Sequence, residues 1–189
     1  MLIFFLSLII IIILHELGHF IVTQKVGGKV EVISIGFGRA IYKKTINGVV
    51  CQITPWLLGG YCKLKGELEI SNDKESFSNL PYLKKVAIAI AGCAINILLG
   101  MLCFFIGIKL NIFNLYYFGL LSFLLGVTNL IPIPCLDGGY VIWLPILTKI
   151  FGHKKGFCYF AIINKISFIL IIILNILCIP FIIMNWRNL

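Results

Sequence analysis

The sequence contains little charge, and acidic residues are the scarcest of all. Charged residues make up 12% of its 189 residues and only 7 are Asp or Glu, whereas about a quarter of a soluble domain is charged. Hydrophobic residues account for 60% of the chain, and the mean hydropathy is +1.07. This composition excludes an ordinary soluble domain and predicts an integral membrane protein.

The sequence also lacks a cysteine framework, an internal repeat and a low-complexity linker. Its 7 cysteines are odd in number, have no zinc-finger spacing and stand mostly in apolar runs, where cysteine behaves as a small hydrophobic residue. We therefore expect no disulfide scaffold. Because no repeat or linker divides the chain, we expect a single domain over residues 1–189.

Long hydrophobic runs are what the sequence has instead. A helix needs ~20 apolar residues to cross a hydrocarbon core of ~30 Å. Four stretches are long enough, at residues 2–22, 86–108, 112–133 and 160–183. The first does not have the features of a signal peptide, because it has no basic start and no small-residue cleavage site. The predicted fold class is an α-helical integral membrane protein with about four transmembrane helices.

The basic residues are concentrated in two of the connections. Of the 16 Lys and Arg, ten lie between the first and second stretches, and four lie between or at the third and fourth. The positive-inside rule then places both termini outside and the two basic loops in the cytoplasm. This topology accounts for the net charge of +9, so we expect a lipid bilayer and no nucleic acid as partner.

The first basic loop has the pattern of a small β-sheet. β-branched and aromatic residues are mixed with glycines, and the Asn47-Gly48 pair between two such runs is a strong signal for a hairpin turn. The many apolar residues predict a sheet that is associated with the membrane. The sheet should occupy about residues 30–64, with strands near 30–35, 39–44, 49–54 and 61–64.

Ionisable residues are costly in a membrane helix, yet His15-Glu16-Leu17-Gly18-His19 stands at the end of the first apolar stretch. On a helix the two histidines project from one face and can bind one metal ion, with Glu16 beside them. In such a site zinc lowers the pKa of a bound water to ~7, and the carboxylate accepts its proton. The pattern predicts a zinc site with Glu16 as general base.

A catalytic zinc usually has three protein ligands, so a third should come from elsewhere in the chain. Apart from Glu16, only Asp137 among the acidic residues lies in or at the edge of an apolar stretch. It stands in segment 129–140, where two prolines disfavour a helix and predict an extended or broken backbone that lines a wet cavity or is buried by protein. His153 is the other candidate, but it lies in a short loop, where a solvated role is the simpler interpretation.

Two asparagines, Asn96 and Asn129, also lie within apolar runs. Either side chain is able to hydrogen-bond the backbone of a bound substrate. A structural hydrogen bond between helices explains either residue equally well. Both roles stay open at this point.

Together these residues resemble the site-2 protease family of intramembrane zinc metalloproteases, in particular its regulator-of-sigma-E protease type. HELGH matches the zinc helix, N-x-x-P-x-P-x-L-D-G-G matches the second metal motif, and SIGFGRAIY, LLGGYCKLKGE and AGCAIN look like further elements of that type. The resemblance implies His15, His19 and Asp137 as zinc ligands and Glu16 as the catalytic carboxylate. It also implies that Asn129 holds substrate backbone.

The sequence departs from that family type in two places. Cys93 stands where the family usually has proline, so the second apolar stretch lacks the usual cause of a local kink. The family type carries PDZ modules between its second and third spans, whereas only a few residues connect the corresponding stretches here. The connection cannot hold a PDZ filter for substrates.

The resulting hypothesis is hydrolysis of a peptide bond in or near the transmembrane segment of a single-span membrane protein, in regulated intramembrane proteolysis. The expected location is a bacterial cytoplasmic (inner) membrane, with the active site toward the cytoplasm. Zinc transport or storage is an alternative, because intramembrane His and Asp also mark ion pathways. An inactive substrate-binding scaffold is a second alternative. The sequence indicates no oligomeric state.

Overall fold

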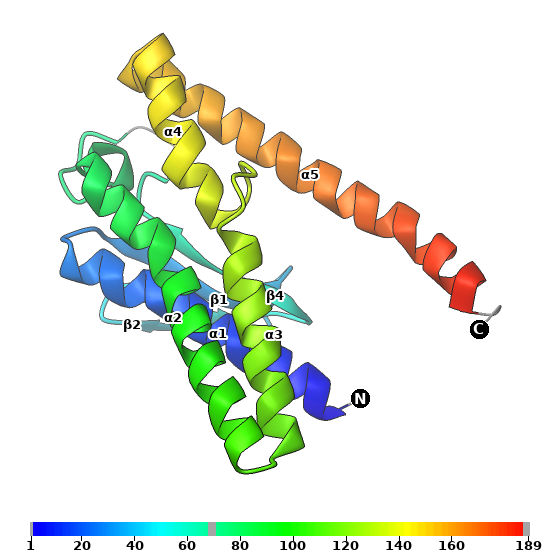
Figure 1. Cartoon of the computed structure of the whole chain (residues 1–189). Coiled ribbons are helices and arrows are strands. Elements are labelled where there is room, and N and C mark those ends of the chain that lie inside the picture. The colour runs from blue at the N-terminus through cyan, green and yellow to red at the C-terminus, as the bar shows by residue number, and fades with distance from the viewer. Residues whose placement is uncertain (1, 68–70, 187–189) are drawn as a thin grey trace.

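Five α-helices and one four-stranded sheet form the part of the chain that the computed structural model describes, residues 2–67 and 71–186. The side chains of residues 2, 58 and 175–186 are outside this description. Figure 1 shows the arrangement of these elements. Their order is α1 (Leu2–Lys25), β1 (Val30–Phe37), β2 (Tyr42–Ile46), β3 (Val49–Ile53), β4 (Trp56–Leu64), α2 (Tyr82–Lys109), α3 (Phe113–Asn129), α4 (Asp137–Phe151) and α5 (His153–Trp186).

Three of the described helices are long and apolar enough to cross a membrane: Ile3–Lys25, Tyr82–Lys109 and His153–Leu174. The mostly helical fold with long apolar helices is therefore confirmed, but the count of four spans is not. The predicted third span, 112–133, is represented by α3, which has 17 residues and ends at Asn129. The two prolines that follow cannot donate backbone hydrogen bonds, so the helix stops before them.

Helices α2 and α3 form a tightly packed pair, joined by residues 110–112. Glycines allow the close contact, because a Cβ atom on Gly100 would lie 2.5 Å from the backbone nitrogen of Phe123. A Cβ atom on Gly119 would lie 2.3 Å from the nitrogen of Phe104. Helix α2 continues through Cys93 without interruption, and the short turn leaves no inserted module between the two helices.

The sheet has the strand order β2-β3-β1-β4. Strands β2 and β3 form the predicted hairpin, with Asn47 and Gly48 at φ values of 50° and 81°, as a type I′ turn requires. Strand β1 pairs with β3 in parallel and with β4 in antiparallel orientation. Strand β4 is thus an edge strand, and it begins at Trp56, earlier than the predicted 61–64.

The sheet lies beside α1, and the strand nearest to that helix is β4. Gly60 of β4 is close to the helix, since a Cβ atom there would lie 3.1 Å from Cγ2 of Ile12 and 3.4 Å from Cγ of Glu16. Apolar side chains of the sheet and its connections are exposed, among them Ile41 just before β2, at 73%, and Trp56 of β4, at 67%. Contact between the sheet and the bilayer stays a prediction.

Segment 130–136 is non-helical, as the prolines predict. Trp143 braces it by donating a hydrogen bond from Nε1 to the carbonyl oxygen of Pro132, at 2.7 Å. The chain then enters α4 at Asp137, a helix that the Gly-Gly pair and an internal proline did not suggest. Gly138 and Gly139 are needed because their backbone touches this segment, so that a Cβ atom on either would lie within 2.3 Å of a carbonyl oxygen.

The buried core lies at one end of the molecule, where the sheet, the segment before α2, α4 and the start of α5 meet. Helix α5 begins at His153, so the predicted loop 152–155 was wrong. Only Gly152, at a φ of 78°, separates α4 from α5. Beyond this attachment α5 runs away from the other helices (Figure 1). The core residues are Val30, Val49, Leu64, Phe77, Leu80, Ile88, Leu144, Leu147, Phe157 and Phe160.

Candidate metal centre

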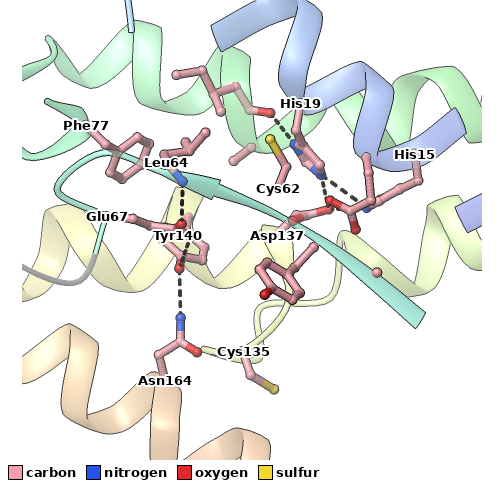
Figure 2. Close-up of a pocket in the computed structure, with 15 residues that line it drawn as sticks. His15, His19, Cys62, Leu64, Glu67, Phe77, Cys135, Asp137, Tyr140 and Asn164 are labelled. Atoms are coloured by element: carbon pink, nitrogen blue, oxygen red, sulfur yellow. Dashed lines mark hydrogen bonds and ion pairs between the residues drawn. The ribbon is translucent and has the colours of Figure 1, made fainter. Parts of the chain in front are cut away.

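The structure brings His15, His19 and Asp137 together (Figure 2). The two histidines lie one turn apart on α1 and are buried, with their Nε2 atoms 3.1 Å apart. Oδ2 of Asp137, the first residue of α4, lies 3.0 Å from Nε2 of His15 and 3.3 Å from Nε2 of His19. Two segments more than a hundred residues apart therefore meet at one point.

This donor set fits a zinc ion. Neighbouring ligands around a tetrahedral zinc with bonds of ~2.1 Å are about 3.4 Å apart, and the three donor atoms here are separated by 3.0, 3.1 and 3.3 Å. Two imidazoles and a carboxylate are ligands that zinc prefers. Among the residues that the structure describes, no second group of this kind occurs.

Residues of helix α2 fix the positions of the two histidine rings. Nδ1 of His19 donates a hydrogen bond to the carbonyl oxygen of Ile88 at 2.8 Å, which leaves Nε2 unprotonated and able to bind a metal. Gly92 clears the space for both rings, because a Cβ atom there would lie 2.5 Å from Nε2 of His19 and 2.8 Å from Cε1 of His15. A larger residue at this position would displace the ligands.

Glu16 faces the same cavity as the three candidate ligands. The cavity has a volume of about 200 Å³, and Glu16 is half-buried in its wall. Strand β4 forms another part of that wall with Gly60, Tyr61, Cys62 and Leu64 (Figure 2). A carboxylate, a candidate metal site and the edge strand of a sheet therefore line the same cavity.

A second carboxylate in the cavity, Glu67, was not predicted. Its Oε1 accepts a hydrogen bond from the hydroxyl of Tyr140 at 2.8 Å, and its Oε2 accepts one from the backbone N–H of Leu64 at 3.1 Å. Asn164 of α5 in turn donates to the Tyr140 hydroxyl at 3.0 Å. Burial raises the pKa of Glu67, and the two hydrogen bonds oppose that shift. Its polar sequence setting gives no sign of burial.

The remaining candidates from the sequence lie outside the cavity wall. Asn96 is fully buried, with Nδ2 at 3.2 Å from Nδ1 of His15. Asn129 is the half-buried last residue of α3 and does not line the cavity. A substrate-binding role stays a prediction for both asparagines. His153 is away from the cluster, at the exposed start of α5, and its Nε2 donates to the carbonyl oxygen of Ser78 at 3.0 Å.

Comparison with protein families gives a match over most of the chain. The profile described as peptidase family M50 matches residues 3–114 and 109–174. Both parts of the candidate metal centre, the histidine pair on α1 and Asp137 on α4, fall within the matched ranges.

Curated relatives agree with this match. A protein of Borreliella burgdorferi, provisionally named a zinc metalloprotease, is 41% identical over 109 residues, which cover 52% of this chain and 25% of the relative. One of Campylobacter jejuni with the same provisional name is 40% identical over 101 residues, covering 51% and 27%. Protease RseP of Yersinia pestis is 36% identical over 108 residues, covering 54% and 24%. The alignments thus span about a quarter of these relatives' length.

Proposed function

The chain belongs to peptidase family M50, and on this premise we propose that it is a multi-pass membrane zinc metalloprotease. Its substrate would be a single-span membrane protein, cleaved in or near the transmembrane segment in regulated intramembrane proteolysis. The observation that carries the proposal is the shared cavity, in which Glu16 lies beside the cluster of His15, His19 and Asp137. Metal ligands and a free carboxylate in one cavity are what metal-assisted hydrolysis requires.

The residues have separate roles in this reaction. His15, His19 and Asp137 would hold zinc, which when bound supplies a Lewis acid for the substrate carbonyl and an acidic water. Glu16 takes a proton from the attacking water as the new carbon–oxygen bond forms. It then gives that proton to the amine as the carbon–nitrogen bond breaks. Glu16 makes no hydrogen bond or ion pair within the described part of the chain, so its carboxylate is available for both transfers.

Substrate presentation is the role that we assign to β4. The amide groups of a transmembrane helix are hydrogen-bonded within the helix, so the cleaved segment has to unwind before its carbonyl is accessible. An unwound segment can pair with an open sheet edge. Strand β4 is such an edge and also lines the cavity, so a strand added to it would run past Glu16.

The orientation of the site in the membrane follows from the distribution of charge and from the position of the site on α1. His15 and His19 lie in the second half of α1, which ends at Lys25 and leads into the basic loop. The positive-inside rule assigns this end to the cytoplasm. Cleavage in a bacterial cytoplasmic membrane would thus release a cytoplasmic fragment. Zinc transport or a passive scaffold role would give Glu16 no function in the cavity, so the protease is the better explanation.

The test is cleavage of a single-span reporter protein in vesicles that contain the full chain, loaded with zinc. We expect the wild type to produce a cytoplasmic fragment and Glu16→Gln to lose 10²- to 10⁴-fold in rate, roughly the usual contribution of a general base. The zinc content of the variant should equal that of the wild type.

Glu75→Gln is the matched control, because Glu75 is exposed and lies outside the cavity. This variant should cleave at the wild-type rate. Equal processing of the reporter by wild type and Glu16→Gln would overturn the proposed function.

A further inference from the structure

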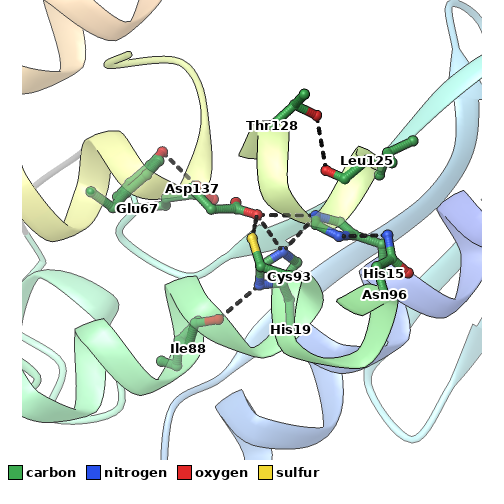
Figure 3. Close-up of polar contacts among 10 residues, drawn as sticks. His15, His19, Glu67, Ile88, Cys93, Asn96, Leu125, Thr128 and Asp137 are labelled. Carbon is green, nitrogen blue, oxygen red and sulfur yellow. Dashed lines mark hydrogen bonds and ion pairs between the residues drawn. The ribbon is translucent and has the colours of Figure 1, made fainter. Parts of the chain in front are cut away.

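Each of the three candidate ligands receives a hydrogen-bonding partner from the same helix, α2. The carbonyl oxygen of Ile88 accepts the hydrogen bond from Nδ1 of His19. Asn96 contacts His15, and Cys93 contacts Asp137 (Figure 3). Partners of this kind fix the orientation of metal ligands and are themselves part of a metal site's affinity.

Asn96 is placed to select the tautomer of His15. Nε2 of His15 faces the other two candidate ligands, so metal binding there requires the proton on Nδ1. The amide of Asn96 lies 3.2 Å from Nδ1 and is fully buried, and its Oδ1 has no partner. Turning the amide by 180° puts Oδ1 opposite the Nδ1–H group, where it accepts the hydrogen bond.

Cys93 is placed to hold the Asp137 carboxylate. Its side chain is fully buried, and Sγ donates to Oδ2 of Asp137 at 3.2 Å. This is the same oxygen that faces His15 and His19. Asp137 begins α4 directly after a non-helical segment, so a contact from α2 fixes its carboxylate relative to the histidines of α1. The thiol is small enough to fit between the helices and still supplies a donor.

We propose that Asn96 and Cys93 are positioning residues of the metal centre, the first for His15 and the second for Asp137. In this proposal Asn96 orients a metal ligand, and the thiol of Cys93 has a role besides packing. The inference rests on the metal site of the proposed function, but it does not depend on the reaction or on the substrate. It predicts effects on metal affinity that can be measured without any cleavage assay.

The experiment measures zinc affinity of the purified full chain in detergent by competition with a chromophoric chelator. Asn96→Leu should weaken zinc binding roughly 10- to 100-fold, whereas Asn96→Asp, which keeps an acceptor, should restore most of it. Cys93→Ala should weaken binding by about 10-fold, near the lower end of that range, and Cys93→Ser, which keeps a donor, should recover it.

Cys103→Ala is the matched control, because it makes the same change on α2 away from the cluster. Its affinity should equal that of the wild type, and thermal unfolding of each variant without metal shows whether the fold is kept. Dissociation constants within twofold of the wild type for both Asn96→Leu and Cys93→Ala would overturn the inference. Absence of zinc binding by the wild type would instead overturn the metal site of the proposed function.

Cobalt substitution separates a positioning cysteine from a ligating one. With Co²⁺ in the site, a thiolate ligand produces a strong charge-transfer band in the near ultraviolet, which a thiol that only donates to Asp137 does not. We expect the wild type and Cys93→Ser to lack that band. A band that disappears in Cys93→Ala would show that Cys93 binds the metal directly, and the positioning role would be wrong.

Discussion

The first half of α2, residues 82–96, and its second half, residues 97–109, are both mostly apolar in sequence but contact different neighbours. In the first half, Ile88, Gly92 and Asn96 lie against the candidate ligands of α1. In the second half, Gly100 and Gly107 lie against the backbone of α3. Both halves use glycine for close contact, but the neighbour is a pair of imidazole rings in one case and a helix backbone in the other.

This difference indicates that small residues in a membrane helix have two separable roles. Packing of helix against helix depends on van der Waals contact, which small residues allow. Support of a metal site depends on polar groups and on space for ligands at fixed positions. Substitutions in the two halves should therefore damage different properties of the same protein.

The largest effect is expected from Gly92→Ala. The added Cβ atom would lie 2.5 Å from Nε2 of His19, so that ring has to move away from His15 and Asp137. Zinc affinity should fall beyond the roughly 10- to 100-fold typical of losing an outer hydrogen-bonding partner. Competition with a chelator measures the loss. Wild-type affinity in this variant would mean that the rings are not confined by α2.

Gly100→Ala should show the reverse pattern. Its Cβ atom would lie 2.5 Å from the backbone nitrogen of Phe123 and would push α3 from α2. Overpacking of this kind costs about 1–3 kcal/mol, which thermal unfolding in detergent would detect. Zinc affinity should be unchanged. If both glycine variants lost affinity and stability to the same extent, the two halves of α2 would not be functionally distinct.

A smaller effect is expected from Tyr140→Phe. Tyr140 lines the same cavity but lies on α4, outside both halves of α2. The change removes the hydroxyl between Glu67 and Asn164 but keeps the ring against Phe77 and Phe160. Losing a hydrogen bond to the half-buried Glu67 carboxylate should cost about 1–3 kcal/mol of unfolding free energy. Zinc content should stay the same, because the hydroxyl of Tyr140 hydrogen-bonds Glu67 and Asn164 rather than a candidate ligand. Loss of zinc in this variant would show that the hydrogen bonds of Tyr140 contribute to metal binding.

The parts of the fold that the sequence predicts are those with strong local signals. The HELGH spacing on a helix, the Asn47-Gly48 hairpin and the broken segment before Asp137 all have such signals. Helix α4 was missed because its glycines, typical of turns, are needed for contact with segment 130–136. The parallel pairing of β1 with β3 has no local signal, since it joins strands across a hairpin.

The residues of the candidate site also divide into those that the sequence predicts and those that only the structure shows. His15, His19 and Asp137 could be named from motif and apolar setting, and the structure places them together. Glu67 and the contact of Cys93 with Asp137 could not, because both depend on which distant segments meet. Asn96 was recognised as unusual, but only the structure shows that His15 is its neighbour.

The most direct test of the account is the zinc content of the purified full chain and of four single variants. We expect a single zinc ion in the wild type, its loss in His15→Ala, His19→Ala and Asp137→Ala, and full zinc content in His153→Ala. X-ray absorption at the zinc edge of the wild type should show nitrogen and oxygen neighbours at ~2.0–2.2 Å. Full zinc content in Asp137→Ala, or its loss in His153→Ala alone, would contradict the account.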